Sequence, residues 1–243
     1  MSKFSHTAAA VLLAGGRSSR MSGVVEDKIL WKLNQKPVIQ YSLESFASLP
    51  FIVEIVIVVR DKDQENCIRK ILPNSTHELD FTFCIGGEER QNSVYNGICA
   101  SKSKPDQIFI HDSARPLLRP CTIKTMYQLL HRVSGTTLAH RLTDSIKRAV
   151  NPEPTQSPSS LVDVNRLALW AMETPQAFHY DTIKRAYQKV MEEKAFITDD
   201  NAAFELLGEK IQIVENTCLN PKITYPQDLS FLEYIIKTQN ETN

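Results

Sequence analysis

The stretch AAAVLLAGGRSSRM, residues 8–21, joins an apolar strand to a loop of small residues that carries two arginines. Its two successive glycines have no Cβ atoms, so the backbone can approach a ligand closely and point N–H groups at anionic oxygens. Arg17 and Arg20, with Lys28 further along, supply the positive charge that such oxygens require. The stretch therefore predicts a site for a nucleoside triphosphate at the end of the first strand.

The spacing of this loop differs from the two common glycine motifs. After Gly15 and Gly16 the chain has Ser18 and Ser19, so the third glycine of a dinucleotide fingerprint is missing. No lysine follows a glycine, as a P-loop requires. Taken alone, the loop is equally compatible with a tight strand-to-helix turn whose arginines are solvated.

The overall composition favours one α/β domain over residues 1–243 and a small ligand. The 243 residues are 42% hydrophobic, and 28 basic residues balance 28 acidic ones. Without a net charge, no global field favours nucleic acid or an anionic membrane, so a phosphate site must use locally placed cations. We expect no nucleic-acid partner.

Two further features indicate the compartment. The longest apolar run, 51–59, is interrupted by Glu54 and is too short for a membrane span, and the first seven residues have no apolar signal-peptide core. The five cysteines are widely spaced, with no CxxC pair, as is typical of reduced thiols. We expect a cytoplasmic protein without a membrane partner.

Apolar runs alternate with helical periods along the chain. Strands are expected at 8–13, 52–59, 81–85, 108–111, 136–140 and 210–214, and helices at 38–47, 64–72, 91–100, 122–133, 181–194, 199–207 and 226–237. This alternation predicts a mostly parallel open sheet with helices on both faces, in which ligands bind at the carboxyl ends of the strands. The loops 14–16, 86–93 and 111–116 should therefore converge on one rim.

The segment 144–164 has a different character. Two short strands, at 145–150 and 161–164, flank a stretch with three prolines, which indicates a hairpin with a turn at its tip. Such a small arm needs a surface to pack on, and a second copy of the chain is the simplest candidate, with a solvated hairpin as the alternative. Asp199 and Asp200 open an expected helix, which favours capping over a ligand contact.

Eight segments carry a resemblance to a known family. They are AGGRSSRM (14–21) with Lys28, GGEERQNSV (86–94), HDSARP (111–116), DSIKR (144–148), VNRLALW (164–170), TPQAF (174–178), ITDD (197–200) and NPKITYPQDL (220–229). In this order and spacing the chain resembles the 2-C-methyl-D-erythritol 4-phosphate cytidylyltransferases of the non-mevalonate isoprenoid pathway. The resemblance implies a Rossmann-like nucleotidyltransferase fold.

The implied reaction joins CTP and 2-C-methyl-D-erythritol 4-phosphate into 4-diphosphocytidyl-2-C-methyl-D-erythritol and releases pyrophosphate. The attacking phosphate oxygen is already ionised near neutral pH, so cations rather than a general base should carry the catalysis. By resemblance, Arg20 and Lys28 neutralise charge on the α-phosphoryl group, while Arg166 and Lys222 aim the attacking phosphate. His111 is expected to orient its loop rather than to transfer protons.

The resemblance also implies the two binding sets. The nucleotide set is Ala14, Gly15, Gly16, Gly87, Glu88, Ser93 and Asp112, and the acceptor set is Asp112, Arg115, Ser145, Arg166, Thr174 and Lys222. Magnesium is expected on triphosphate oxygens and water, with no protein metal ligand. A homodimer is expected through the arm, with Arg166 reaching into the partner's site.

The chain departs from the family pattern at several positions. Asp27 precedes Lys28 where the family usually has proline, which predicts a partial offset of the lysine charge, and Glu88 stands where aspartate is more frequent. His140 and Arg141 replace smaller residues. The alternatives are a ribitol 5-phosphate cytidylyltransferase and a catalytically silent nucleotide-binding protein. A nicotinamide-dependent oxidoreductase is disfavoured by the glycine spacing.

Overall fold

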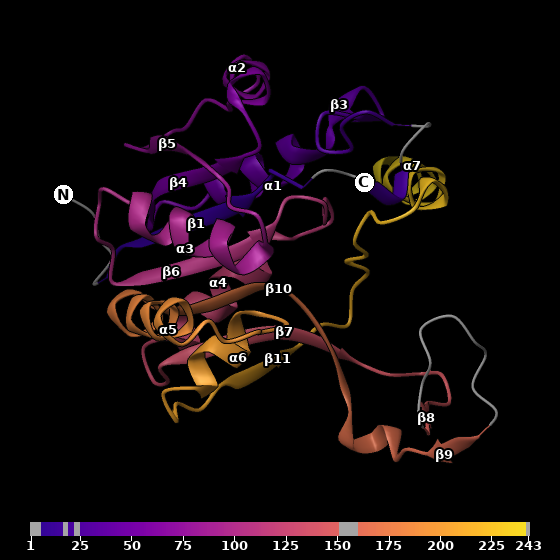
Figure 1. The fold of residues 1–243 in the computed structure, drawn as a ribbon. Helices are drawn as coiled ribbons and strands as arrows, with labels where there is room; N and C mark the ends of the chain where they lie inside the picture. Colours follow the sequence, from indigo (N-terminus) through magenta and orange to yellow (C-terminus); the bar gives the residue numbers. More distant parts are fainter. Residues whose placement is uncertain (1–5, 17–18, 22–24, 151–159, 242–243) are drawn as a thin grey trace.

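Seven strands form one sheet in the order β11-β7-β10-β6-β1-β4-β5 (Figure 1). The computed structural model describes residues 6–16, 19–21, 25–150 and 160–241. The strands of this sheet are β1 (Ala8–Leu13), β4 (Ile52–Val59), β5 (Asp80–Ile85), β6 (Gln107–Asp112), β7 (Gly135–Arg141), β10 (Trp170–His179) and β11 (Gln212–Glu215). Only β10 runs antiparallel to its neighbours in the sheet. The sheet is therefore open and mostly parallel, as predicted.

Helices cover both faces of the sheet. They are α1 (Val38–Ala47), α2 (Lys62–Arg69), α3 (Arg90–Ala100), α4 (Pro120–Leu129), α5 (Tyr180–Glu193), α6 (Asp200–Glu205) and α7 (Pro226–Glu241). Successive β1 side chains enter two separate cores, because strand side chains alternate between faces. Leu12 joins the core that contains residues of α1, α4 and α7, whereas Val11 joins the core that contains residues of α3, α5 and α6.

The strand register aligns the carboxyl ends of the central strands. Leu13 of β1 pairs with Val58 of β4 and with Asp112 of β6, and Val59 pairs with Ile85 of β5. The loops that follow these strands therefore start at one rim of the sheet, which is the arrangement that the alternation of strands and helices predicted.

The six predicted strands and seven predicted helices all form, with ends that differ by a few residues. The prediction was wrong in leaving out β10, which contains the buried polar residues Glu173, Thr174 and Gln176 and a cis Thr174–Pro175 peptide. It also left out a small hairpin of β2 (Lys32–Leu33) and β3 (Lys36–Pro37). Buried polar residues in a strand break the apolar pattern that identifies a strand from sequence.

The arm extends from the body between β7 and β10 (Figure 1). Its two strands, β8 (Lys147–Ala149) and β9 (Leu161–Asp163), pair antiparallel and are shorter than predicted. The proline-rich tip, 151–159, lies outside the described residues. Among the helices that the structure describes, none combines the length and apolar character that a membrane crossing needs.

Candidate functional site

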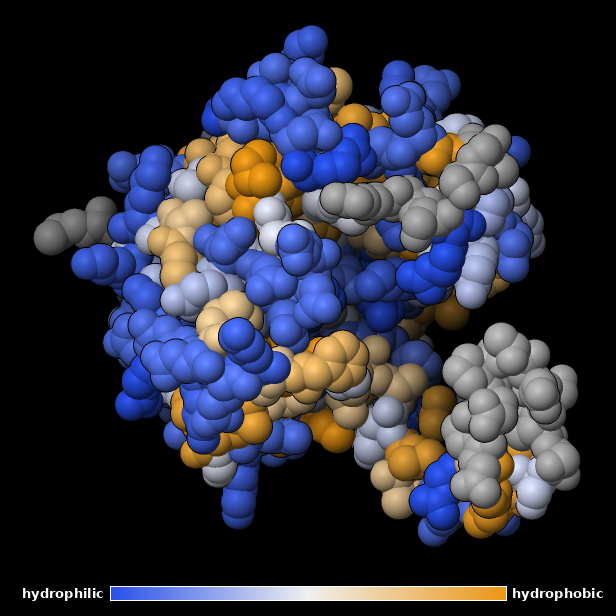
Figure 2. Space-filling model, viewed as in Figure 1, coloured by the Kyte–Doolittle hydropathy of each residue, from blue (hydrophilic) through white to orange (hydrophobic). Residues whose placement is uncertain are grey.

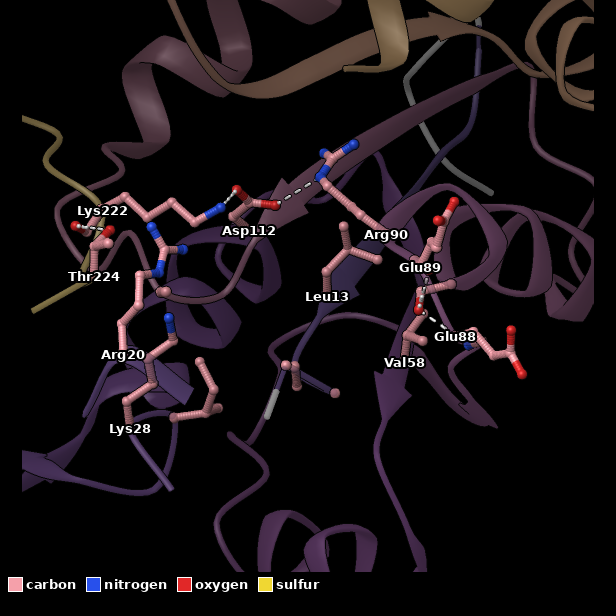
Figure 3. Close-up of a pocket in the computed structure, with 17 residues that line it drawn as sticks. Leu13, Arg20, Lys28, Val58, Glu88, Glu89, Arg90, Asp112, Lys222 and Thr224 are labelled. Atoms are coloured by element: carbon pink, nitrogen blue, oxygen red, sulfur yellow. Dashed lines mark hydrogen bonds and ion pairs between the residues drawn. The ribbon is translucent and has the colours of Figure 1, made fainter. Parts of the chain in front are cut away.

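A cleft of about 310 Å³ opens at the rim where the central strands end. Figure 2 shows hydrophilic residues around a hollow between the upper and lower parts of the body, and Figure 3 shows the side chains that line the cleft. Ten of the fourteen predicted site residues line it: Ala14, Gly15, Gly16, Arg20, Lys28, Gly87, Glu88, Ser93, Asp112 and Lys222. Arg17, which received no assigned role, lies outside the described residues.

The loop after β1 lies directly on the backbone of β4. The Ala14 N–H donates to the Val58 carbonyl at 2.9 Å, and a Cβ on Gly15 would come within 3.1 Å of the Val59 carbonyl carbon. Close backbone packing thus favours glycine at position 15. A Cβ on Gly16 would meet nothing within 4 Å, so this backbone borders the open cleft.

The loop between β5 and α3 is closed by Ser93. The Ser93 hydroxyl accepts from the Gly87 N–H at 3.0 Å and donates to the Glu89 carbonyl at 3.2 Å. A Cβ on Gly87 would lie 2.2 Å from the Cβ of Asn92, so no larger residue fits this turn. Ser93, predicted to contact a nucleotide base, therefore also shapes the loop that carries Gly87 and Glu88.

Arg20, Lys28 and Lys222 gather on one side of the cleft, opposite Glu88 and Glu89 (Figure 3). Burial lowers the pKa of the Lys28 ammonium, and the neighbouring Lys222 and Arg20 lower it further. The Lys28 ammonium donates to the Ile223 carbonyl at 2.9 Å. Mutually repelling cations in a cleft have the electrostatics of an anion site, because a bound polyanion relieves their repulsion.

Asp27 turns its carboxylate to other partners than Lys28. One oxygen accepts from the Ile29 N–H at 3.0 Å. The other accepts from the Gln64 amide at 2.7 Å and lies 3.4 Å from a guanidinium nitrogen of Arg60. The carboxylates that raise the pKa of Lys28 are Asp112 and Asp228. These contacts of the Asp27 carboxylate therefore do not support the prediction that Asp27 partly neutralises the Lys28 ammonium.

Asp112 joins the two sides of the cleft. Its carboxylate accepts from the Lys222 ammonium at 2.6 Å and from the Nε of Arg90 at 3.3 Å, as the dashed lines in Figure 3 mark. Burial alone would raise the pKa of Asp112, but Arg90 and Lys222 outweigh it and hold the pKa well below the usual range of a carboxyl group. Asp112 is therefore an anion that orients two cations.

Arg90 lines the cleft but was missed among the predicted site residues. It makes two bonds of 2.8 Å to the carboxylate of Asp200, which is fully buried and also accepts from the Tyr187 hydroxyl. Asp199 caps α6 by accepting from the Ala202 N–H at 3.0 Å. The capping prediction is thus confirmed for Asp199, whereas the charge of Asp200 pairs with Arg90.

His111, Thr174 and Arg115 form the floor beneath Asp112. The Thr174 hydroxyl accepts from the Asp112 N–H at 3.0 Å and lies 3.0 Å from Nδ1 of His111. Burial lowers the pKa of His111 to about 4, so the ring is neutral at pH 7. Arg115 donates to the Asn220 carbonyl at 2.7 Å. Thr174 and Arg115 thus support the loops of Asp112 and Lys222 from below the cleft lining.

Ser145 and Arg166 lie at the arm and do not line this cleft. Arg166, in a short 3-10 helix (Arg166–Ala168), donates to the Thr143 carbonyl. Three apolar side chains near it, Leu161, Val162 and Leu167, are exposed. The arm therefore presents apolar surface together with a basic side chain.

The unusual residues His140 and Arg141 have partners within the chain. His140 lies 2.6 Å from the buried Glu173 carboxylate, and the Arg141 guanidinium lies 4.3 Å from the centre of the Trp170 ring. Both contacts join β7 to β10, where the arm leaves the body. These two departures from the family pattern thus have local structural roles.

Known proteins similar to this chain match it over nearly its whole length. The family model of 2-C-methyl-D-erythritol 4-phosphate cytidylyltransferases matches residues 8–238. The enzyme of that name from Desulforamulus reducens is 33% identical over 231 residues, covering 95% of this chain and 96% of that one. That from Caldanaerobacter subterraneus is 34% identical over 229 residues, covering 94% and 98%. The crystal structure of 4-diphosphocytidyl-2C-methyl-D-erythritol synthase from Anaerococcus prevotii shares the fold, with a TM-score of 0.79, 23% identity and coverage of 95% and 96%.

Proposed function

Because the chain belongs to the 2-C-methyl-D-erythritol 4-phosphate cytidylyltransferase family, whose members are nucleotidyltransferases, we propose that it joins CTP to 2-C-methyl-D-erythritol 4-phosphate. The products are 4-diphosphocytidyl-2-C-methyl-D-erythritol and pyrophosphate. One observation supports this proposal above all: Arg20, Lys28 and Lys222 line the same cleft as the Gly15–Gly16 backbone. A polyanion of triphosphate size needs such a set of cations next to exposed backbone.

The proposed step is an in-line displacement at the α-phosphorus of CTP. A bond forms between an acceptor phosphate oxygen and the α-phosphorus, and the bond from that phosphorus to the α,β-bridging oxygen breaks. Arg20 and Lys28 would stabilise the charge on the α-phosphoryl oxygens, while Lys222 would hold the attacking phosphate. No general base is needed, which agrees with the buried, neutral His111.

The cytidine would bind along the rim formed by Ala14, Gly15, Gly16, Gly87 and Glu88. Backbone groups in these loops can bond a pyrimidine edge, and a close-packed turn excludes a purine by size. Asp112 would contact both substrates, since it lies between Arg90 and Lys222. Its carboxylate fits a sugar or polyol hydroxyl as a hydrogen-bond acceptor.

The donor set fits a divalent cation that is bound mainly by nucleotide oxygens and water. Among the described residues, no group of three or more His, Cys, Asp or Glu side chains could hold a metal ion. Asp112, a carboxylate in the cleft lining, is paired with two cations. When bound, magnesium would neutralise part of the triphosphate charge.

The proposal includes a homodimer in which segment 144–164 is the dimerisation arm of a single domain. Exposed Leu161, Val162 and Leu167 on the arm support an apolar contact with a second copy. Arg166 and Ser145 would then serve the partner's acceptor site, because they lie outside the cleft of their own chain. A cytoplasmic location, favoured by five cysteines without a CxxC pair, remains a prediction.

The test is pyrophosphate release from CTP with magnesium and one of two acceptors. We expect turnover with 2-C-methyl-D-erythritol 4-phosphate and much slower turnover with ribitol 5-phosphate. Faster turnover with ribitol 5-phosphate would replace the proposed acceptor. CTP binding without turnover of either acceptor would instead identify a silent nucleotide-binding protein.

A further inference from the structure

Gln64, in the first turn of α2, is a buried amide that connects three segments of the site. Its Nε2 group donates to the Ala14 carbonyl at 3.2 Å and to the Asp27 carboxylate at 2.7 Å. Its Oε1 accepts from the Arg60 N–H at 2.8 Å. The side chain is only 2% exposed, so leaving these bonds unmade would cost the full penalty of buried polar groups.

Asp27 is the second member of this network, and it directly precedes Lys28. Its Oδ1 accepts from the Ile29 N–H at 3.0 Å, and its backbone carbonyl accepts from the Leu30 and Trp31 N–H groups. Asp27 thereby closes the turn that contains Lys28, through bonds to the three residues that follow it. Its side chain is 8% exposed and lies 3.4 Å from the Arg60 guanidinium, which balances its charge.

The other end of the network is the loop after β1, which contains Ala14, Gly15 and Gly16. The Gly15 Cα lies so close to β4 that an added Cβ would be 3.2 Å from the Arg60 nitrogen. That same N–H of Arg60 is bonded to Gln64. The hydrogen bonds of Gln64 to Ala14, Arg60 and Asp27 therefore connect the loop that contains Gly15, the end of β4 and the turn before Lys28.

We propose that Gln64 and Asp27 are positioning residues that hold Lys28 and the Gly15 loop in a fixed relation. The inference rests on the proposed catalytic role of Lys28 and deepens it. A cation stabilises a transition state only if it is already oriented, so a loosened Lys28 lowers kcat more than it raises the KM of either substrate. Asp27 thus acts through the backbone of Lys28 rather than by neutralising its ammonium.

The test uses the full-length protein and three variants. Gln64→Glu keeps the shape and the acceptor for Arg60 but loses both donors and faces the Asp27 carboxylate. We expect kcat to fall about tenfold or more, with the KM for the acceptor changed less than about twofold. In the double variant Asp27→Asn, Gln64→Glu, the amide of residue 27 can donate to the carboxylate of residue 64. This restores the bond between the two side chains with donor and acceptor exchanged, so kcat should recover toward that of the wild type.

A matched control is Gln40→Glu on α1. Gln40 donates to the Glu44 carboxylate at 2.9 Å, so this change also places a glutamate beside a carboxylate, but neither residue lines the cleft. Its kcat should stay near that of the wild type. A Gln64→Glu enzyme with wild-type kcat, or a double variant no faster than Gln64→Glu, would overturn the proposal.

Hydrogen exchange separates this proposal from the proposed reaction. In Gln64→Glu, amides of residues 25–31 should exchange faster, while those of β1 residues 8–13 keep their protection. If the wild-type protein did not turn over CTP and the acceptor, the proposed function would fail. The exchange result alone would then decide whether Gln64 fixes this segment, and unchanged exchange would refute it.

Discussion

The ammonium of Lys222 donates to the carboxylate of Asp112 at 2.6 Å, although the two residues are 110 positions apart in the chain. The contact joins the last residue of β6 to the segment before α7. An acceptor phosphate that binds Lys222 would therefore share this ammonium with Asp112. The pairing makes Asp112 a determinant of both stability and orientation.

Asp112→Asn should lower stability at pH 7 by about 1–3 kcal/mol, because two cations lose a charged acceptor. The pKa of Asp112 is depressed in the folded protein, so its contribution is complete above the unfolded pKa of about 4 and is lost as the pH falls through the folded value. Urea unfolding from pH 7 to pH 3 should show the difference from the wild type shrinking below about pH 4. A difference that stays constant over this range would contradict the assignment.

Lys28→Ala should lower turnover by about 10²–10³ while the protein remains folded, since one preorganised donor is lost. The pKa of Lys28 is lowered by burial, Lys222 and Arg20, so its charge is lost at a lower pH than the ordinary 10.5. The alkaline decline of kcat/KM should therefore begin below that value in the wild type. It should move upward in Lys28→Arg; an unmoved decline would assign it to another group.

Arg90 and Asp200 should couple strongly in a double-mutant cycle. Arg90→Met alone leaves the fully buried Asp200 without its two bonds from Arg90, which should cost about 3–5 kcal/mol. Adding Asp200→Asn should recover part of that loss, so the double variant is more stable than the sum predicts. Additive losses in urea unfolding would show that the pair is not a unit.

His111 should make folding sensitive to mild acid. Its pKa is lowered to about 4, so the unfolded chain binds the proton first as the pH falls below about 6.5. The contribution of the neutral ring is lost between these two values, in total about 3 kcal/mol. Urea unfolding at pH 7 and pH 4 should therefore show a steeper loss for the wild type than for His111→Gln. An equal loss of unfolding free energy between pH 7 and pH 4 in both proteins would mean that another group causes the acid sensitivity.

Mixing two inactive variants tests the proposed shared site. Lys28→Ala and Arg166→Ala each disable a site, but a mixed dimer would hold one cleft with Lys28 and the partner's Arg166 intact. Subunit exchange should restore about one quarter of wild-type activity, as random pairing requires. No recovery on mixing, despite subunit exchange shown by light scattering or tagged copies, would place Arg166 in its own chain's site.

The loops at the rim could be predicted from the sequence because each one is placed by the strand that precedes it. Gly15 and Gly87 come two residues after the ends of β1 and β5, and Asp112 is the last residue of β6. Parallel strands bring these carboxyl ends together. Arg90 could not be found in this way. An arginine in the first turn of a helix is normally solvated, and here its role depends on Asp200, 110 residues further along. The same holds for Gln64, whose partners Ala14 and Asp27 come from other segments.

The missing strand β10 has a similar cause. Thr174 and Gln176 are buried, but their bonds go to Asp112 and Asp200, which the pattern within one strand cannot show. Periodicity identifies a strand when apolar residues fill its buried positions. A strand whose buried polar residues bond to site residues lacks that apolar pattern, so it cannot be identified from its own sequence.

β10 runs antiparallel to β7, so the arm that connects them leaves and re-enters the body at the same rim. β7 and β10 are neighbours whose pairing, from Gly135 with Phe178 to Arg141 with Trp170, is fixed inside the body. Everything between them is a single excursion from one rim, and lengthening a loop costs little closure entropy. Insertions at the tip can therefore change the length of the arm without altering the register of the sheet, so the body can keep its fold while the arm varies.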